Sequence, residues 1–260
     1  MGSSAAIVTG ASSGIGTELA RELHRRGHPV VLVARSAGRL EQLAAELGED
    51  AYPLPADLSD RAARAALPAR VEELGLVPDV LVNNAGLSTL GPVAECDPAA
   101  ELNMIEVDVA AVVDLCSRFL PGLVARGHGA VLNVASTAAF QPLPGQAGYA
   151  AAKAFVLSYT QSLAGELRGT GVTATALCPG PVETGFGPTA GFTEEQAKGA
   201  LPGVLWVDAA KVAKAAVDGL ERGRLVVIPG AANRVTSALA QVTPRKLLLP
   251  VLAKGHPGLK

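Results

Sequence analysis

The sequence predicts a single doubly wound α/β domain, with seven parallel strands in one sheet and helices on both faces. Seven short apolar, β-rich runs recur along the chain, and Ala-, Leu-, Glu- and Arg-rich stretches with helical spacing lie between them. Several runs are apolar without strict alternation, which is typical of strands covered on both faces. The alternation of strands and helices indicates βαβ units with right-handed crossovers.

The predicted strands or strand ends are residues 5–10, 29–35, 51–58, 79–86, 130–136, 172–180 and 224–230. Helices are expected where apolar spacing runs up to a glycine, as in "IGTELARELHRRG" (15–27) and "AGRLEQLAAELGED" (37–50). No composition break marks a second domain. We therefore assign residues 1–230 to the α/β domain and residues 231–260 to a basic C-terminal helix or tail.

The composition restricts the function classes. The chain has 260 residues, of which 49% are apolar and 18% charged, which fits a globular protein. Its net charge of −2 gives no general attraction to nucleic acid. The charge is uneven, because residues 222–260 contain seven Lys and Arg and no Asp or Glu.

The cysteines and the chain ends predict a cytoplasmic protein. Cys96, Cys116 and Cys178 are far apart and form no CxxC pair, which favours a reducing compartment. We find no charged leader segment and no apolar run long enough to span a membrane. His24 and His28 are separated by Gly27, a predicted helix end, so we expect no metal site.

The first strand–helix junction predicts a dinucleotide site. "TGASSGIG" (9–16) follows the first predicted strand and opens the first predicted helix. Gly10, Gly14 and Gly16 allow a tight turn, close approach to a diphosphate and close helix packing. The free N–H groups at the start of the helix would then face the phosphates.

The end of the second strand favours NADP(H) over NAD(H). Ala34 and Arg35 stand where an NAD-type site usually has Asp or Glu, and no acid follows before Glu41. A guanidinium can pair with a 2′-phosphate, which a carboxylate would repel. The alternative is that Arg35 only solvates a loop.

Three proton-handling groups lie within "STAAFQPLPGQAGYAAAK" (136–153). Tyr149 and Lys153 are four residues apart on a predicted helix and should share one face. A free phenol has a pKa of about 10, and a neighbouring ammonium is expected to lower that pKa. Ser136 ends the fifth strand, at the edge where such sheets bind ligands. Its hydroxyl could orient a carbonyl oxygen while Tyr149 exchanges the proton.

With "NNAG" (83–86) and "PGPVET" (179–184), these motifs make nearly the whole chain resemble a short-chain dehydrogenase/reductase. The resemblance implies a Rossmann-type fold and hydride transfer between a nicotinamide and a carbonyl or alcohol, with Tyr149 as acid/base, Ser136 as carbonyl orienter and Lys153 on the nicotinamide ribose. It also implies a homodimer or homotetramer, through the helices containing residues 98–125 and 147–169. The cofactor-binding residues that it implies are Gly10, Ser12, Ser13, Gly14, Ile15, Gly16, Arg35, Asp57, Leu58, Asn83, Ala85, Gly86, Tyr149, Lys153, Pro179, Gly180, Val182 and Thr184.

One residue departs from that resemblance. The family usually carries Asn in the fourth helix, and this chain has Asp108 in "MIEVDVAAVVDL". We count Asp108 among the catalytic candidates and expect turnover with an altered pH dependence. A non-catalytic NADP(H)-binding sensor or scaffold is the alternative.

The remaining segments bear on substrate and partners. Residues 185–207 are a predicted substrate lid, and their apolar side chains either face an apolar or lipid-like substrate or only pack on the core; they are Phe186, Phe192, Leu201, Val204, Leu205 and Trp206. Cys178 is expected to fill the core. The basic C-terminal tail could touch a membrane surface, cover a subunit interface or pack on its own domain.

Overall fold

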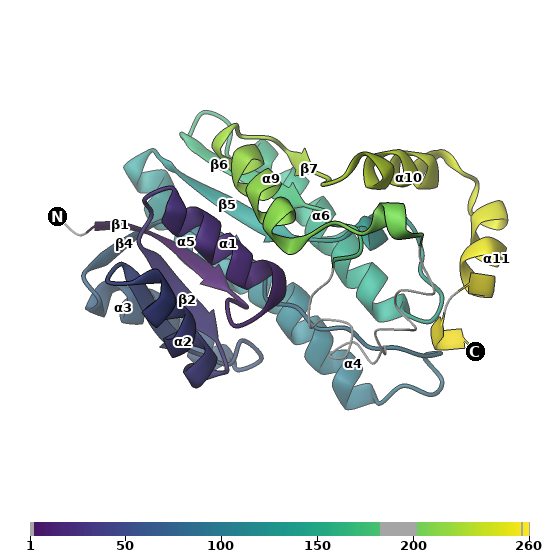
Figure 1. Ribbon diagram of the computed structural model, residues 1–260, viewed down its shortest axis with the longest axis horizontal. Coiled ribbons are helices and arrows are strands. Elements are labelled where there is room, and N and C mark those ends of the chain that lie inside the picture. Colours follow the sequence, from purple (N-terminus) through teal and green to yellow (C-terminus); the bar gives the residue numbers. More distant parts are fainter. Residues whose placement is uncertain (1–2, 183–201, 256, 260) are drawn as a thin grey trace.

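A seven-stranded parallel sheet forms the centre of the computed structural model, which describes residues 3–182, 202–255 and 257–259 (Figure 1). Its strands are β1 (Ser3–Thr9), β2 (Val30–Ala34), β3 (Ala51–Pro55), β4 (Leu76–Asn83), β5 (Gly129–Val134), β6 (Val172–Leu177) and β7 (Val226–Val227). The order across the sheet is β3-β2-β1-β4-β5-β6-β7. The chain changes direction across the sheet between β1 and β4, and open α/β sheets bind ligands at such a switch point.

Helices cover both faces of the sheet. On one face lie α1 (Gly14–Arg25), α2 (Ala37–Leu47) and α9 (Ala209–Glu221), and on the other lie α3 (Arg61–Glu73), α5 (Ala111–Arg126) and α6 (Ala147–Glu166). Helices α1 and α9 pack side by side (Figure 1). Alternate residues of β1 enter the two cores, with Ala5 and Ile7 in one and Ala6 and Val8 in the other. The doubly wound fold and all seven strands predicted from the sequence are confirmed.

The last strand is much shorter than its predicted range of 224–230. β7 has only two paired residues, Val226 and Val227, at the edge of the sheet. Pro229 has no N–H to donate, and Gly230 turns the chain with a φ of +86°. The strand therefore ends before the predicted limit.

The fourth helical segment is interrupted by a π-helical turn. α4 (Pro98–Ile105) continues into η1 (Glu106–Ala110), a π-helix, and then into α5. Buried Arg64 flanks this turn, with Nη2 2.7 Å from Glu106 and Nε 2.8 Å from Asp114. π-Turns are often found at functional sites, and this one carries Asp108.

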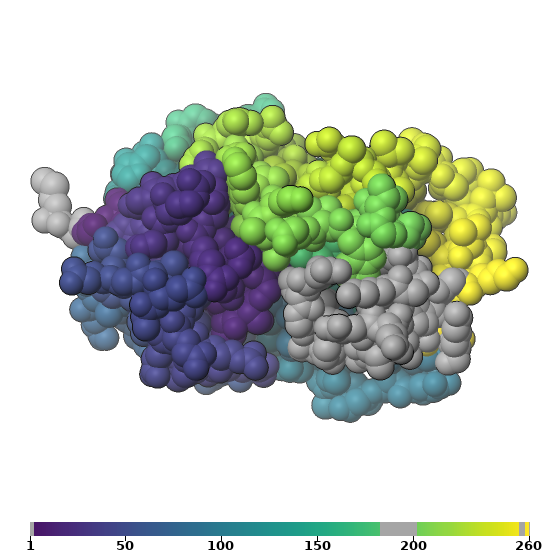
Figure 2. Space-filling model, in the orientation of Figure 1, coloured from purple at the N-terminus to yellow at the C-terminus, as the bar shows by residue number. Residues whose placement is uncertain are grey.

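The C-terminal segment forms α10 (Ala231–Val242), α11 (Arg245–Gly255) and the short 3₁₀-helix η4 (Pro257–Leu259) at one end of the molecule (Figures 1 and 2). α10 packs against η2 (Thr137–Phe140), the 3₁₀-turn after β5. Gly258 lies against Leu90 and Gly145. This segment therefore packs on its own domain.

No helix in the described part of the chain is both long and apolar enough to cross a membrane.

Candidate active site

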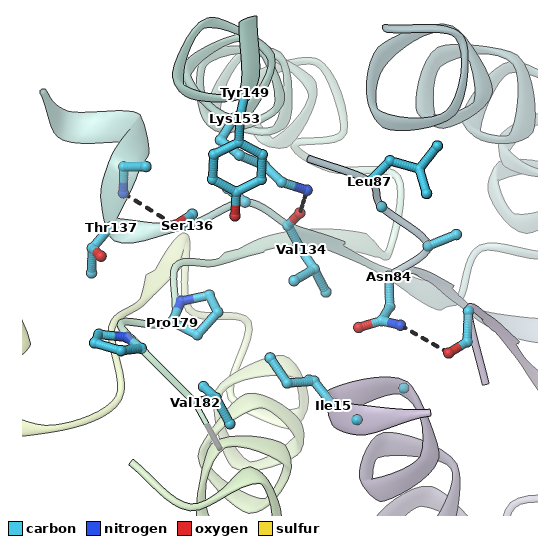
Figure 3. Close-up of a pocket in the computed structure, with 18 of the residues that line it drawn as sticks. Ile15, Asn84, Leu87, Val134, Ser136, Thr137, Tyr149, Lys153, Pro179 and Val182 are labelled. Carbon is cyan, nitrogen blue, oxygen red and sulfur yellow. Dashed lines mark hydrogen bonds between the residues drawn. The ribbon is translucent and has the colours of Figure 1, made fainter. Parts of the chain in front are cut away.

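A cleft of about 950 Å³ lies at the carboxyl ends of the central strands (Figure 3). The described residues that line it come from the first strand–helix turn, the ends of β2, β4, β5 and β6, helix α6 and the C-terminal helices. A cleft of this size can hold a dinucleotide together with a small substrate.

The glycine turn has no room for larger side chains. Gly10 has a φ of +67°, and a Cβ there would lie 2.8 Å from Ala85 Cα. A Cβ at Gly16 would lie 2.2 Å from the Gly10 carbonyl oxygen. Ser13 is the N-cap of α1, but its side chain makes no capping bond. The start of α1 can therefore direct N–H groups at a phosphate.

Asn84, the second residue of the NNAG motif, joins the glycine turn to β4. Its Nδ2 donates to the Thr9 carbonyl at 2.9 Å, and its backbone N–H donates to Thr9 Oγ1 at 2.9 Å. Asn83, predicted to lie beside the adenosine, does not line the cleft. It is buried and donates to Asn133 Oδ1 at 2.8 Å, because it is the last residue of β4 and faces the core. The motif could not tell the two asparagines apart without the strand register.

The end of the cleft beside β2 carries two guanidinium groups. Arg35 and Arg39 both line it, with Ser12 and Ser36 nearby. Arg39 was missed from the sequence, although it lies only four residues after Arg35, in the first turn of α2. Asp57 also lines this end, and its Oδ1 accepts from the Ser59 N–H at 2.9 Å. That bond holds the pKa of Asp57 below its usual value, despite partial burial.

Ser136, Tyr149 and Lys153 meet at the other end. Ser136 follows β5, and its Oγ accepts from the Ala138 N–H at 3.1 Å. Tyr149 and Lys153 lie one turn apart on α6, with Lys153 Nζ 5.6 Å from the Tyr149 ring centroid. Lys153 Nζ donates to the Val134 carbonyl at 3.2 Å. The Tyr149 hydroxyl points toward Ser136 in the cleft (Figure 3).

The net pKa shift of Tyr149 is opposite in sign to the shift expected from its spacing to Lys153. Burial raises the pKa of Tyr149 above its usual value, and the Lys153 ammonium and a hydrogen bond with Ser136 only partly oppose this. Asp108 adds to the rise. Lys153 does lower the pKa of Tyr149, as expected, but desolvation is the larger effect. At neutral pH the phenol is therefore protonated.

Asp108 lies behind Lys153 and does not line the cleft. It is 0% exposed, and its Oδ2 is 3.0 Å from Lys153 Nζ. Burial raises the pKa of Asp108, and Lys153 opposes this shift. Burial alone would lower the pKa of Lys153, but Asp108 and Tyr149 raise it above its usual value. The raised pKa of Lys153, the 3.0 Å contact between Nζ and Oδ2 and the Leu87 N–H bond to Oδ1 favour a buried ion pair, whereas burial opposes the charge on Asp108.

The other predicted residues fall as follows. Gly10, Ser12, Ser13, Gly14, Ile15, Gly16, Arg35, Asp57, Leu58, Ala85, Gly86, Pro179, Gly180 and Val182 all line the cleft. Thr184, Phe186, Phe192 and Leu201 lie outside the described residues, as does most of the predicted lid 185–207. Its described end includes Leu205 and Trp206, which line the cleft, and Val207, which pairs with Val182 in an isolated β-bridge. Cys178 is fully buried, and burial raises its pKa to about 12.

Asn233 joins the segments beside Gly180 at the cleft and was also missed. Its Nδ2 donates to the carbonyls of Leu205 at 2.9 Å and Pro229 at 3.1 Å. Its side chain fills the space above Gly180, where a Cβ would lie 2.3 Å from Asn233 Oδ1. No sequence motif marks it, because all of its partners are backbone groups or glycine.

Across the residues that the structure describes, no three His, Cys, Asp or Glu side chains gather in a group that could hold a metal ion.

Comparison with known proteins places this arrangement in a family. Residues 4–194 match the short chain dehydrogenase family. A short chain dehydrogenase of Pseudocercospora fijiensis is 41% identical over 188 residues, which are 70% of this chain and 60% of that protein's length.

Two solved structures show the same fold. A short-chain dehydrogenase from Sphingobium yanoikuyae in complex with NADPH has a TM-score of 0.80 and 32% identity, over 95% of each chain. A 3-ketoacyl-(acyl-carrier-protein) reductase from Brucella melitensis complexed with NADH has a TM-score of 0.79 and 30% identity, over 89% of this chain and 98% of that one.

Proposed function

The chain belongs to the short-chain dehydrogenase family, and on this premise we propose that it is an NADP(H)-dependent reductase of apolar carbonyl compounds. The observation that carries the proposal is the meeting of Ser136, Tyr149 and Lys153 at one end of a cleft whose other end is a glycine turn. NAD(P)-dependent oxidoreduction follows from the family. The choice of NADP(H), the substrate class and the residue roles are our proposals.

The residues present fit the dinucleotide. The Gly10–Gly16 turn would hold the diphosphate, because a Cβ at Gly16 would collide with the turn itself. Arg35 and Arg39 supply two cations for a 2′-phosphate at the adenosine end. Pro179, Gly180 and Val182 would hold the nicotinamide, which supplies the hydride when bound.

The chain's own residues handle the proton. The Ser136 hydroxyl donates a hydrogen bond to the carbonyl oxygen of the substrate, and Tyr149 transfers its phenolic proton to the same oxygen. The raised pKa of Tyr149 keeps that proton in place at neutral pH. Lys153 binds the ribose and stabilises the phenolate left after the transfer.

The apolar substrate class is supported by the wall around these groups. The described apolar side chains at this end include Leu143, Leu205, Trp206, Val251 and Leu252. A hydrophobic wall of this kind favours a ketone, aldehyde or secondary alcohol with apolar substituents.

We also propose that the protein works in a reducing compartment and associates with copies of itself. Cys96, Cys116 and Cys178 are free, which fits a cytoplasmic protein. Leu102 of α4 is 70% exposed and Phe155 of α6 is 41% exposed, which suits coverage by a second copy. Light scattering of the purified chain would test for the homodimer or homotetramer.

The deciding experiment is NADPH oxidation with a panel of apolar ketones, for the wild type and Tyr149→Phe. We expect this change to lower kcat/KM by at least about a hundredfold, because it removes the proton donor. Tyr159→Phe is the matched control, since Tyr159 lies on the same helix but stacks on Phe155, away from the lining residues. Equal activity of wild type and Tyr149→Phe would refute the assignment. NADPH binding without turnover of any carbonyl would favour the sensor alternative.

A further inference from the structure

The buried carboxylate of Asp108 contacts Lys153, the lysine of the proposed catalytic site. Asp108 Oδ2 lies 3.0 Å from Lys153 Nζ, and Oδ1 accepts from the Leu87 N–H at 2.6 Å. Both carboxylate oxygens therefore have partners of positive character, as an ionised side chain requires. A Cβ at Gly86 would lie 3.1 Å from Lys153 Nζ and 3.2 Å from Asp108 Oδ2, so the backbone of Gly86 covers the pair.

The π-turn fixes where this carboxylate points. η1 contains both Glu106 and Asp108, and the two side chains go to different cations. Glu106 pairs with Arg64, whose side chain is only 3% exposed and which also binds Asp114 on α5. Arg64 thus holds the turn on its outer side while Asp108 faces inward to Lys153. The position of Asp108 is a feature of the fold and not of one mobile side chain.

We propose that Asp108 is a positioning residue that compensates the positive charge of Lys153. It thereby raises the pH at which Tyr149 changes from proton donor to proton acceptor. The inference rests on the proposed function, because it assigns regulation by pH to the same site. It leaves the overall equilibrium between carbonyl and alcohol unchanged. Carbonyl reduction needs the phenol and alcohol oxidation needs the phenolate, so the two reactions share one midpoint.

The groups around Lys153 and Tyr149 act on their ionisation in the direction that the proposal requires. Among the described residues, the groups that act on Lys153 are Asp108 from η1, Tyr149 from its own helix and Cys178 at the end of β6. Burial raises the pKa of Cys178 to about 12, so its thiol is neutral. The pKa of Tyr149 is raised by burial, lowered by Lys153 and Ser136, and raised by Asp108. Removing the Asp108 charge therefore favours the phenolate.

The size of the effect follows from two distances. Lys153 Nζ is 3.0 Å from the carboxylate and 5.6 Å from the ring centroid, so carboxylate and ring are no more than about 9 Å apart. A unit charge at that distance, with an effective dielectric constant of about 20, changes an ionisation equilibrium roughly twentyfold.

The test is Asp108→Asn, which keeps the shape and removes the charge. We expect the fall of carbonyl reduction and the plateau of alcohol oxidation to move together to lower pH in kcat/KM profiles. Glu106→Gln is the matched control, because it removes a carboxylate from the same π-turn that faces Arg64 instead. Its profiles should keep the wild-type midpoint. Asp108→Ser serves as a second variant, and thermal unfolding shows that each variant is folded.

A second readout needs no turnover. The ultraviolet absorbance of tyrosinate, taken as the difference from the matching Tyr149→Phe protein, reports the ionisation of Tyr149 directly. Well below both midpoints we expect roughly twentyfold more tyrosinate in Asp108→Asn. An unchanged midpoint would overturn the proposal. A midpoint at higher pH would also overturn it, since Asp108 would then act by keeping Lys153 charged. If no carbonyl is reduced by the wild type, the proposed function fails while this titration still decides the role of Asp108.

Discussion

Replacing Asn233 by alanine is expected to lower the free energy of unfolding by about 2–4 kcal/mol. The side chain is 2% exposed and joins three segments that are far apart in sequence. It binds the carbonyls of Leu205 and Pro229 and lies against Gly180. The change therefore removes a side chain that links these three segments.

The magnitude follows from those contacts. Two neutral hydrogen bonds contribute about 1 kcal/mol each, and leaving the buried Pro229 carbonyl without this donor adds about 1–2 kcal/mol. Urea unfolding measures the loss as a lower midpoint at constant slope. A constant slope shows that the native state still buries the same surface.

Ser237→Ala is the control for this prediction. Ser237 lies on the same helix, is 3% exposed, and its Oγ has no hydrogen-bond partner among the residues described. Removing an unsatisfied buried hydroxyl should change the free energy of unfolding by less than about 0.5 kcal/mol, or stabilise the protein. Equal effects of Asn233→Ala and Ser237→Ala would refute the reasoning.

Two further predictions concern ligands. Arg35→Ala should weaken NADPH binding about tenfold to a hundredfold and leave NADH binding within about twofold, because a charge-assisted bond to the 2′-phosphate is lost. Quenching of Trp206, the single tryptophan, measures both affinities, and a parallel loss for NADH would contradict the role of Arg35. Leu252→Asp should raise the KM for an apolar ketone about tenfold, since it places a charge in the apolar wall. Leu247→Asp on the exposed face of α11 should not, and equal KM values for the two variants would count against a substrate wall formed by α11.

Much of the fold could be predicted because it depends on local patterns. The strands buried on both faces read as apolar runs, and β2 is buried at every position. The glycine turn was predictable for the same reason, since Gly10 and Gly16 are required by contacts within one βα junction. The spacing of Tyr149 and Lys153 on one helix face was equally local.

The rest depends on tertiary placement. The role of Asn84 in place of Asn83 needs the register of β4, and the π-turn at Glu106–Ala110 has no sequence signal. The net pKa shift of Tyr149 could not be read from its spacing to Lys153, because burial is the larger cause. Asn233 acts only on backbone groups, which every residue has.

The two faces of the sheet divide the molecule's tasks. Lys153 and Asp108 lie on the side of α5 and α6, whereas the buried side chains of α9 pack with α1 on the opposite side. Substitutions at Val212 or Leu220 should therefore change the thermal unfolding midpoint. They should not disturb the Asp108–Lys153 ion pair on the opposite side of the sheet. At the α9 layer, stability can therefore be altered independently of the proposed catalytic site.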